Sequence, residues 1–171
     1  DGFINSASVI HWAAMLTVFS ISHIAYLLAL PVQNILAGSI GSVLFLLFMT
    51  QFNDVSQYVF GKLFGKHKII PKVSPNKTWE GFIGGLCTVT LISGFLAPYL
   101  TPLDGYYGYI AGFLISVFGF FGDVVISSLK RDIKIKDTGT LIPGHGGILD
   151  RLDSLLYTAP VFFHFLYYIK Y

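Results

Sequence analysis

Charged residues and cysteine are both scarce in this sequence, and each scarcity excludes a class of protein. Only 12% of the 171 residues are charged, whereas 54% are hydrophobic. Soluble domains carry about 25% charged residues, and one soluble core could not bury so much apolar surface. The single cysteine, Cys87, excludes an intramolecular disulfide, so the fold does not depend on an oxidising compartment. The composition is therefore that of a membrane protein.

Five apolar segments each approach the roughly 20 residues that a helix needs to cross about 30 Å of hydrocarbon. They cover about residues 8–30, 32–52, 81–100, 107–128 and 152–169. Only Pro31 and its neighbours separate the first two, which predicts a tight antiparallel helical hairpin. We expect an all-α, polytopic transmembrane bundle of about five spans that forms one membrane-embedded domain over residues 1–171. Because the chain starts at Asp1 rather than Met, we also expect that an N-terminal part of the protein precedes it.

Basic residues are concentrated in two long connections between these segments, 53–80 and 129–151. Ten of the eleven Lys and Arg residues fall there. Alternation of the spans places both connections on one side of the membrane, and the positive-inside rule makes that side cytoplasmic. Such loops can serve only to orient the protein and to touch anionic lipid headgroups. The case for a functional site therefore depends on the residues beside them.

Three aspartates lie where the last two apolar segments meet the basic connections. Asp123 lies about one and a half helical turns before the polar connection, at a depth where an acidic side chain usually faces a cavity, a bundle interior or a cation. Asp150 and Asp153 are three residues apart and share one helix face. Three such carboxylates can bind a hard divalent cation such as Mg²⁺. Two alternatives stay open: Asp123 pairs with a Lys or Arg, and the other two only favour a helix N-terminus.

Glycine and cationic residues near the aspartates predict contacts with phosphate groups. Glycines on both sides of His145 place it in a turn and let backbone amides approach an anion. In the first connection, Ser74 as an N-cap followed by Pro75 predicts a helix start that presents Lys77 to phosphate. A cap that only begins the third span explains the same residues. Together these features predict a substrate with several phosphates, bound beside lipid.

These residues resemble the signature of the CDP-diacylglycerol synthases, or phosphatidate cytidylyltransferases. That signature runs Ser, any residue, an apolar residue, Lys-Arg, four residues and Lys-Asp, and ends in His-Gly-Gly, apolar, any, Asp-Arg, apolar, Asp. The chain has SSLKR at 127–131, KD at 136–137 and HGGILDRLD at 145–153. SPNKTWEG at 74–81 and the residues around Asn53 resemble two further blocks of the family, although Gln57 stands where many members have a small residue.

The resemblance implies that the protein transfers a cytidylyl group from CTP to phosphatidic acid, giving CDP-diacylglycerol and pyrophosphate. The lipid phosphate would attack the α-phosphate of CTP with the help of Mg²⁺, and K⁺ is a candidate second cation. The expected partners are CTP, phosphatidic acid, membrane lipids and a second copy of the chain in a homodimer, with no nucleic acid. The expected location is a bacterial inner membrane, with the active site on the cytoplasmic face.

The resemblance also assigns roles to individual residues. The implied metal ligands are Asp123, Asp150 and Asp153. The implied catalytic residues are Asp123, Lys130, Arg131, Lys136, His145 and Asp150, and the implied substrate-binding residues are Asn53, Asp54, Ser74, Lys77, Thr78 and Arg151. Three alternatives stay open: a CTP-dependent lipid kinase, a cytidylyltransferase for another lipid phosphate, and an ion or anion transporter.

Overall fold

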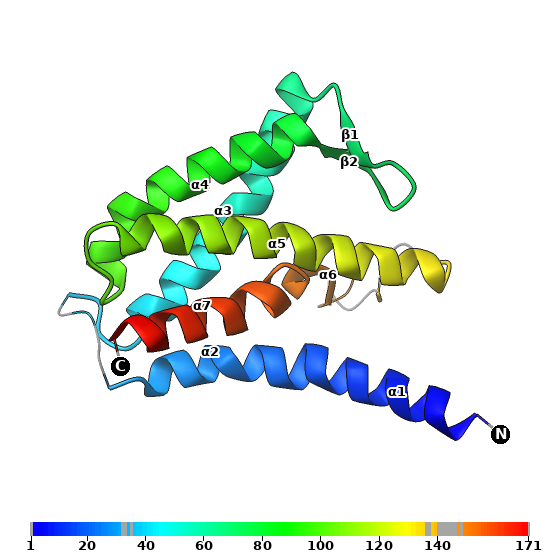
Figure 1. The fold of residues 1–171 in the computed structure, drawn as a ribbon, viewed down its shortest axis with the longest axis horizontal. Helices are drawn as coiled ribbons and strands as arrows, with labels where there is room; N and C mark the ends of the chain where they lie inside the picture. Colours follow the sequence, from blue (N-terminus) through cyan, green and yellow to red (C-terminus); the bar gives the residue numbers. More distant parts are fainter. Residues whose placement is uncertain are drawn as a thin grey trace.

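The structure, a computed structural model, describes residues 2–31, 34, 36–135, 138–139, 147 and 149–170, apart from the side chains of Asn5 and Arg151. It is a helical bundle with one small β hairpin (Figure 1). Helix α1 (Phe3–Ala14) continues through a π-helical turn (Met15–Phe19) into α2 (Ser20–Ala29). The longer helices that follow are α3 (Gly41–Phe64), α4 (Trp79–Leu100), α5 (Tyr107–Asp132) and α7 (Leu155–Lys170), with the short α6 (Leu149–Leu152) before the last. Strands β1 (Lys68–Ile70) and β2 (Ser74–Thr78) pair antiparallel between α3 and α4.

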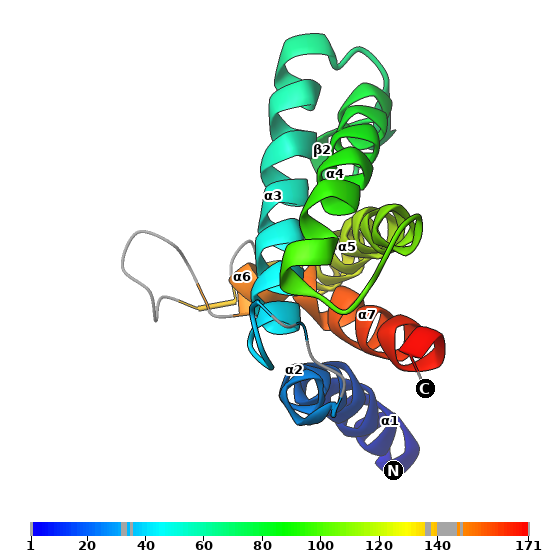
Figure 2. The same cartoon turned by 90° about the vertical axis from the view of Figure 1, so that its left-hand side faces the viewer.

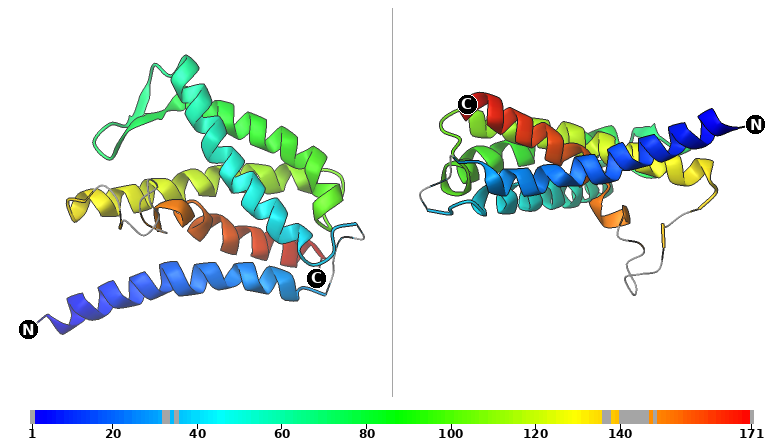
Figure 3. Two further views of the ribbon diagram at one scale, coloured as in Figure 1. Left: turned by 180° about the vertical axis from the view of Figure 1, so that it is seen from behind. Right: turned by 90° about the horizontal axis from the view of Figure 1, so that it is seen from below.

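The elements alternate between two ends of the bundle. One end carries the start of α1, the β hairpin, the end of α5 and α6; the other carries the ends of α2 and α4 and the C-terminus (Figures 1 and 3). The described parts of the two basic segments therefore lie at the same end, as the sequence predicts. We call this the basic end.

Three helical stretches in the described residues are long and apolar enough to cross a membrane: Ser6–Ala29, Trp79–Leu100 and Tyr107–Asp132. They confirm the polytopic membrane bundle, although the sequence predicts about five spans. The other two helices fall short for different reasons. Helix α3 carries the polar residues Asn53 and Asp54 in its middle, and α7 has only 16 residues, fewer than the roughly 20 that a straight crossing needs.

The tight hairpin expected between the first two predicted spans is wrong. Helix α2 ends at Ala29 and α3 begins only at Gly41. Asn34, between them, donates hydrogen bonds from Nδ2 to the carbonyls of Pro98 and Thr101, both at 2.8 Å. The connection is thus fastened to the far end of α4, and α2 packs mainly on α7 while α3 packs on α4 (Figure 2).

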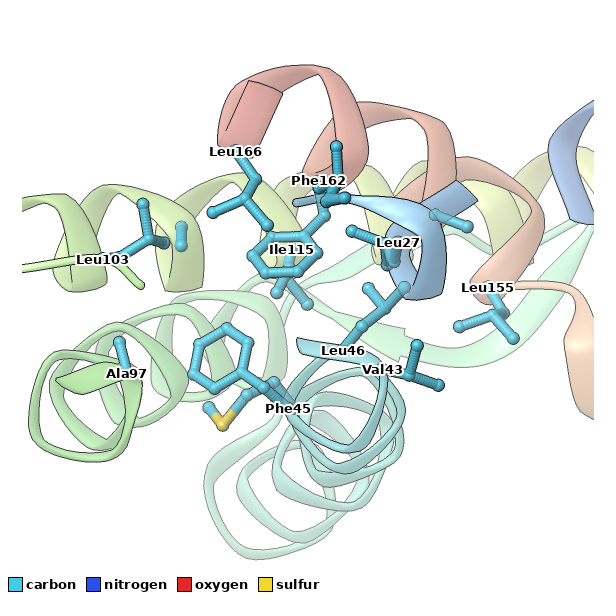
Figure 4. Packing of buried hydrophobic residues seen from close by; sticks show 14 of the residues in the cluster. Leu27, Val43, Phe45, Leu46, Ala97, Leu103, Ile115, Leu155, Phe162 and Leu166 are labelled. Carbon is cyan, nitrogen blue, oxygen red and sulfur yellow. The ribbon is translucent and has the colours of Figure 1, made fainter. Parts of the chain in front are cut away.

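The core lies where α2, α3, α4, α5 and α7 meet. Its centre contains Phe45 and Phe162, whose ring centroids are 5.4 Å apart, surrounded by buried aliphatic side chains (Figure 4). Small residues bring α4 and α5 together: a Cβ at Gly112 would lie 2.4 Å from that of Ser93, and Ser93 Oγ donates to the Gly108 carbonyl at 2.6 Å. Close backbone approach of this kind is typical of helix pairs in membranes, where lipid offers no hydrophobic driving force.

Candidate active site

Asp123 on α5 meets a lysine that comes from the β hairpin. Its Oδ2 lies 2.6 Å from Lys77 Nζ, and its Oδ1 accepts a hydrogen bond from Ser127 Oγ at 3.0 Å. The Lys77 ammonium also lies 4.8 Å from the ring centroid of Phe120, where the face of an aromatic ring attracts a cation. The expected alternative, an acid paired with a nearby cation, is therefore the state of Asp123 in this structure.

A second lysine–aspartate pair joins the end of α5 to α6. Lys130 Nζ donates to Asp150 Oδ1 at 2.7 Å, while Oδ2 accepts from the backbone N–H and hydroxyl of Thr138 and the N–H of Gly147 at 2.8–2.9 Å. Burial alone would raise the pKa of Asp150, but these hydrogen bonds outweigh it and hold the pKa below its usual range. Asp150 thus fixes two described points of the loop to α5.

Two further carboxylates lie near these pairs: Asp54 on α3, and Asp153, which directly precedes Ser154. Ser154 Oγ donates to Asp54 Oδ1 at 3.1 Å, and its N–H donates to Asp153 Oδ1 at 2.8 Å. Burial, together with the charge of Asp123, raises the pKa of Asp153 to about 6. The carboxylates of Asp54, Asp123 and Asp153 are close enough to interact electrostatically. The basic end therefore concentrates negative charge that two lysines only partly neutralise.

Gly122 on α5 allows these carboxylates to come close together. A Cβ at Gly122 would lie 2.6 Å from the Asp153 carbonyl oxygen and 3.1 Å from Ser154 Cα. Any side chain would push the start of α7 away from α5. The absence of one lets Asp153 approach Asp123, the residue that follows Gly122 on α5.

Two pockets open on either side of Asp54, Tyr58 and Asp123, which line both. The first, the β2 pocket, has a volume of about 160 Å³. It is lined by Asp54, Gln57, Tyr58, Ser74, Asn76, Lys77, Thr78, Phe82, Phe120 and Asp123. The second, the carboxylate pocket, has a volume of about 350 Å³. It is lined by Gln51, Asp54, Val55, Tyr58, Asp123, Asp150 and Asp153.

The carboxylate pocket has the oxygen ligands that a hard cation prefers, but its side chains are not arranged around a single ion. Among the described residues, no three His, Cys, Asp or Glu side chains come close enough to hold one ion. Asp123 and Asp150 are each held by a lysine. Asp54 and Asp153 have no ion-pair partner in the described part of the chain. Carboxylate oxygens are the donors that Mg²⁺ prefers, so the donor set fits such an ion.

The predicted helix start at Ser74 is wrong. Ser74 lies in β2, where it pairs with Ile70 of β1, and α4 begins at Trp79. The N-cap is Thr78, whose Oγ1 accepts a hydrogen bond from the Gly81 N–H at 3.1 Å. Strand pairing extends the backbone that the sequence pattern assigns to a helix. Lys77 nevertheless lies just before the helix start.

The structure brings most of the predicted site residues together. Ser74, Lys77, Thr78, Asp54 and Asp123 line the β2 pocket, while the carboxylate pocket includes Asp54, Asp123, Asp150 and Asp153. Lys130 contacts the latter group through Asp150. Lys136 and His145 lie outside the described residues, as does the side chain of Arg151.

Two predicted residues lie elsewhere. Arg131 is exposed and donates from Nε to the carbonyl of Val73 at 3.2 Å, so it fastens the turn of the hairpin to α5. Asn53 is fully buried. Its Oδ1 accepts from Ser116 Oγ at 2.7 Å and from Gln57 Nε2 at 3.0 Å. Asn53 therefore joins α3 to α5 beneath the pocket and has no exposed surface to offer a substrate.

Comparison with known proteins decides the family. Residues 1–169 match the cytidylyltransferase family. The chain belongs to this family. It is 52% identical over 171 residues to "Uncharacterized protein YnbB" of Escherichia coli K12, covering all of this chain and 57% of that protein. It is 43% identical over 121 residues to the phosphatidate cytidylyltransferase of Mycobacterium leprae, covering 71% of this chain and 39% of the relative.

A third relative gives the same result. The phosphatidate cytidylyltransferase of Staphylococcus haemolyticus is 42% identical over 122 residues, which is 70% of this chain and 46% of the relative. The family resemblance expected from the sequence is confirmed. The chain spans about half the length of the curated relatives that it matches.

Several residues that line the pockets of this cytidylyltransferase family member were not predicted as site residues from the sequence. Gln57 and Tyr58 follow Asp54 at three and four positions, so a helix continued beyond residue 52 places all three on one face. That spacing was available as a signal. Phe82 and Phe120, whose rings lie 4.7 Å apart in the β2 pocket, come from two helices and carry no such signal.

Proposed function

We propose that this chain is the catalytic part of a phosphatidate cytidylyltransferase, which transfers the cytidylyl group of CTP to phosphatidic acid and releases pyrophosphate. One observation carries the proposal: two lysine–aspartate pairs and two further carboxylates surround adjoining pockets at one end of a membrane bundle. Membership of the cytidylyltransferase family supports it. So does the identity of 42–43% to proteins that carry this enzyme's name.

The proposed reaction needs charge control more than proton transfer. The nucleophile is a phosphate monoester whose second pKa is about 6, so it is mostly dianionic at neutral pH. One of its oxygens attacks the α-phosphorus of CTP. The new P–O–P bond forms as the bond to the β-phosphate breaks, and the electron pair leaves with pyrophosphate. No proton has to be removed, and the barrier lies in bringing anions together in line.

Lys77 and Lys130 are suited to that task because each already neutralises a carboxylate at the pocket wall. In our proposal a phosphate group competes with Asp123 for the Lys77 ammonium, and another phosphate competes with Asp150 for Lys130. Both lysine side chains are mostly buried, at 14% and 13% exposed, so water screens the new contacts little. Movement of Lys77 would leave the Asp123 carboxylate facing the carboxylate pocket.

The sequence predicts Asp123, Asp150 and Asp153 as ligands of a divalent cation. Because Asp150 accepts four hydrogen bonds, we propose that Asp54, Asp123 and Asp153 hold the ion and that Asp150 anchors the loop. A bound Mg²⁺ would neutralise charge on the reacting phosphates and on the pyrophosphate. The second cation, K⁺, and the homodimer stay predictions. The positive-inside rule supports a cytoplasmic basic end, and the bacterial relatives support the inner membrane.

The decisive experiment follows radiolabel from CTP into lipid. Purified protein in mixed micelles receives CTP labelled at the α- or γ-phosphate, with or without phosphatidic acid and with Mg²⁺ or EDTA. We expect the α-label to enter the lipid phase only when phosphatidic acid and Mg²⁺ are present, and the γ-label to stay in water as pyrophosphate. Lys170→Gln removes a lysine that pairs with Asp104 at the opposite end of the bundle, so this control variant should retain activity.

Each alternative gives a different outcome. Transfer of the γ-label alone to lipid would identify a CTP-dependent lipid kinase. Transfer of the α-label to another lipid phosphate in preference would identify a different cytidylyltransferase. Ion or anion flux in liposomes without CTP turnover would identify a transporter.

A further inference from the structure

Four lysines lie outside both pockets, on the end of α3 and on the β hairpin. Lys62, Lys66, Lys68 and Lys72 are all exposed. None has an ion-pair partner among the described residues. The sequence contains no Asp or Glu between residues 55 and 79, so the segment that carries these lysines has no acidic side chain of its own. The proposed reaction uses none of the four.

Large apolar side chains are exposed beside these lysines. Leu63, Phe64 and Trp79 are 68%, 59% and 51% exposed. Trp79 is also the first residue of the membrane-spanning helix α4. A tryptophan at the start of a span marks the boundary between hydrocarbon and headgroups. Trp79 therefore places the start of α4 at the level of the headgroups.

Hydrogen bonds fix the segment between α3 and the hairpin beside Trp79 and Glu80. Glu80 accepts from the backbone N–H groups of Lys66 and His67 at 3.1–3.3 Å and bonds His67 Nδ1 at 2.6 Å. The Trp79 N–H donates to the His67 carbonyl at 2.9 Å. A Cβ at Gly65 would lie 2.7 Å from Thr78 Oγ1, so α3 and β2 are in close contact. The hairpin, which projects beyond the start of α4 in Figure 1, thus has a fixed base.

We propose that this surface binds the anionic phospholipid headgroups of the leaflet around it. Its residues, called here the basic–aromatic surface, are Lys62, Leu63, Phe64, Lys66, Lys68, Lys72 and Trp79. Charge complementarity identifies the occupant, because four exposed lysines without a carboxylate partner in the described part of the chain lie beside the start of a membrane span, where lipid phosphates are found. The apolar side chains enter the hydrocarbon boundary, and the lysine stems extend along it with their charges in the headgroups.

The β hairpin connects the basic–aromatic surface to the proposed reaction site. Strand β2 supplies Ser74 and Lys77 to the β2 pocket, and its partner β1 carries Lys68. Anionic lipid gathered on the surface would therefore be concentrated at the mouth of that pocket. This consequence rests on the proposed function, whereas headgroup binding does not.

Fluorescence quenching of Trp79 tests the binding directly. The protein, with every other tryptophan replaced by Phe, is reconstituted into phosphatidylcholine nanodiscs that contain brominated phosphatidylglycerol or brominated phosphatidylcholine at equal mole fraction. We expect the anionic quencher to be at least about three-fold more effective, because each lysine near a membrane surface favours anionic lipid several-fold. Salt at about 1 M should reduce the preference, since screening then acts within about 3 Å.

Two variants make the test specific. Replacement of all four lysines by Gln should bring the ratio of the two quenching constants close to one, while replacement by Arg, which retains the charge, should preserve it. Circular dichroism and the unquenched Trp79 emission check that each variant is folded. If the Gln protein does not fold, Lys68→Gln and Lys72→Gln should each lower the ratio partially.

A ratio near one in the parent protein would overturn the proposal, as would a preference that survives in a folded Gln variant. The surface would then be the contact site of another part of the protein or of a second copy. An activity assay separates this result from the reaction itself. With a water-soluble short-chain phosphatidic acid, the parent and the Gln variant should turn over CTP equally, whatever the quenching shows.

Discussion

Replacing Lys77 tests whether one ammonium serves two partners in turn. Lys77→Met keeps the apolar stem near Phe120 and removes the charge, while Lys77→Arg keeps the charge. The contact with Asp123 is 2.6 Å long, and the two side chains are 14% and 29% exposed, between an exposed pair and a buried one. Exposed pairs contribute up to about 1 kcal/mol, and breaking a buried pair costs about 3–5 kcal/mol. We therefore expect Lys77→Met to destabilise the protein by about 1–3 kcal/mol.

The assay is a double-mutant cycle with Asp123→Asn, measured as the apparent Tm in detergent and as kcat/KM for CTP. For a chain of this size, about 2 kcal/mol corresponds to a Tm change of roughly 4–8 °C. In stability, the double variant should recover part of the loss, because neither charge is left unpaired. In activity it should recover nothing, because the phosphate still lacks the ammonium. The Arg variant should retain more activity than the Met variant.

Two outcomes would refute this argument. Additive changes in Tm would show that the two side chains do not interact. Activity restored in the double variant would show that Lys77 only neutralises Asp123 and has no phosphate to bind.

Three further predictions concern the other carboxylates. Gly122→Leu should lower the apparent Tm by overpacking against Asp153, a cost of about 1–3 kcal/mol, whereas Gly139→Ala, where the nearest heavy atom would be 3.9 Å away, should change it little. Asp150→Asn leaves the Lys130 ammonium buried without its partner and should cost about 3 kcal/mol, part of which returns when Lys130→Met is added. Because burial raises the pKa of Asp153 to about 6, the folded protein binds this proton more tightly than the unfolded chain. That stabilisation, about 3 kcal/mol, is complete below pH about 4 and lost as the pH rises to about 6. In metal-free buffer, Asp153→Asn should therefore flatten the fall in Tm over this range; an unchanged slope would contradict the assignment.

The sequence predicts the part of the site that a single helix determines. Asp123, Ser127 and Lys130 recur at intervals of four and three residues, so one helix is enough to put them on a common face. In the structure Ser127 bonds Asp123, and Lys130 reaches the pocket through Asp150. The range of α5 is predicted equally well, because its apolar run is long and uninterrupted.

Contacts between distant segments were harder to predict. Ser74 and Pro75 have the residue types of a helix start, and only the pairing of Ile70 with Ser74 makes them a strand. The partner of Asp123 likewise comes from 46 residues earlier in the chain, on the far side of a helix and a turn. Local patterns give the type of each residue, whereas such pairs depend on how α3, α4 and α5 pack.

The polar residues in the middle of α3 explain why this helix is not a clear membrane span, and they also contribute to the proposed site. This helix is too polar to count as a clear span because it carries Asn53 and Asp54 among apolar residues. Thr50 and Thr158 bond at 3.0 Å in the core, and one turn later Asn53 bonds Ser116. Unpaired polar groups at such depth are costly, and Thr50 Oγ1 and Asn53 Oδ1 find their partners on α7 and α5. Asn53 Nδ2 is buried without a hydrogen-bond partner among the described residues. The contacts with α5 and α7 hold Asp54 beside Ser154, facing both pockets. The polarity that makes α3 a poor independent span is thus what fixes a carboxylate between the two lysine–aspartate pairs.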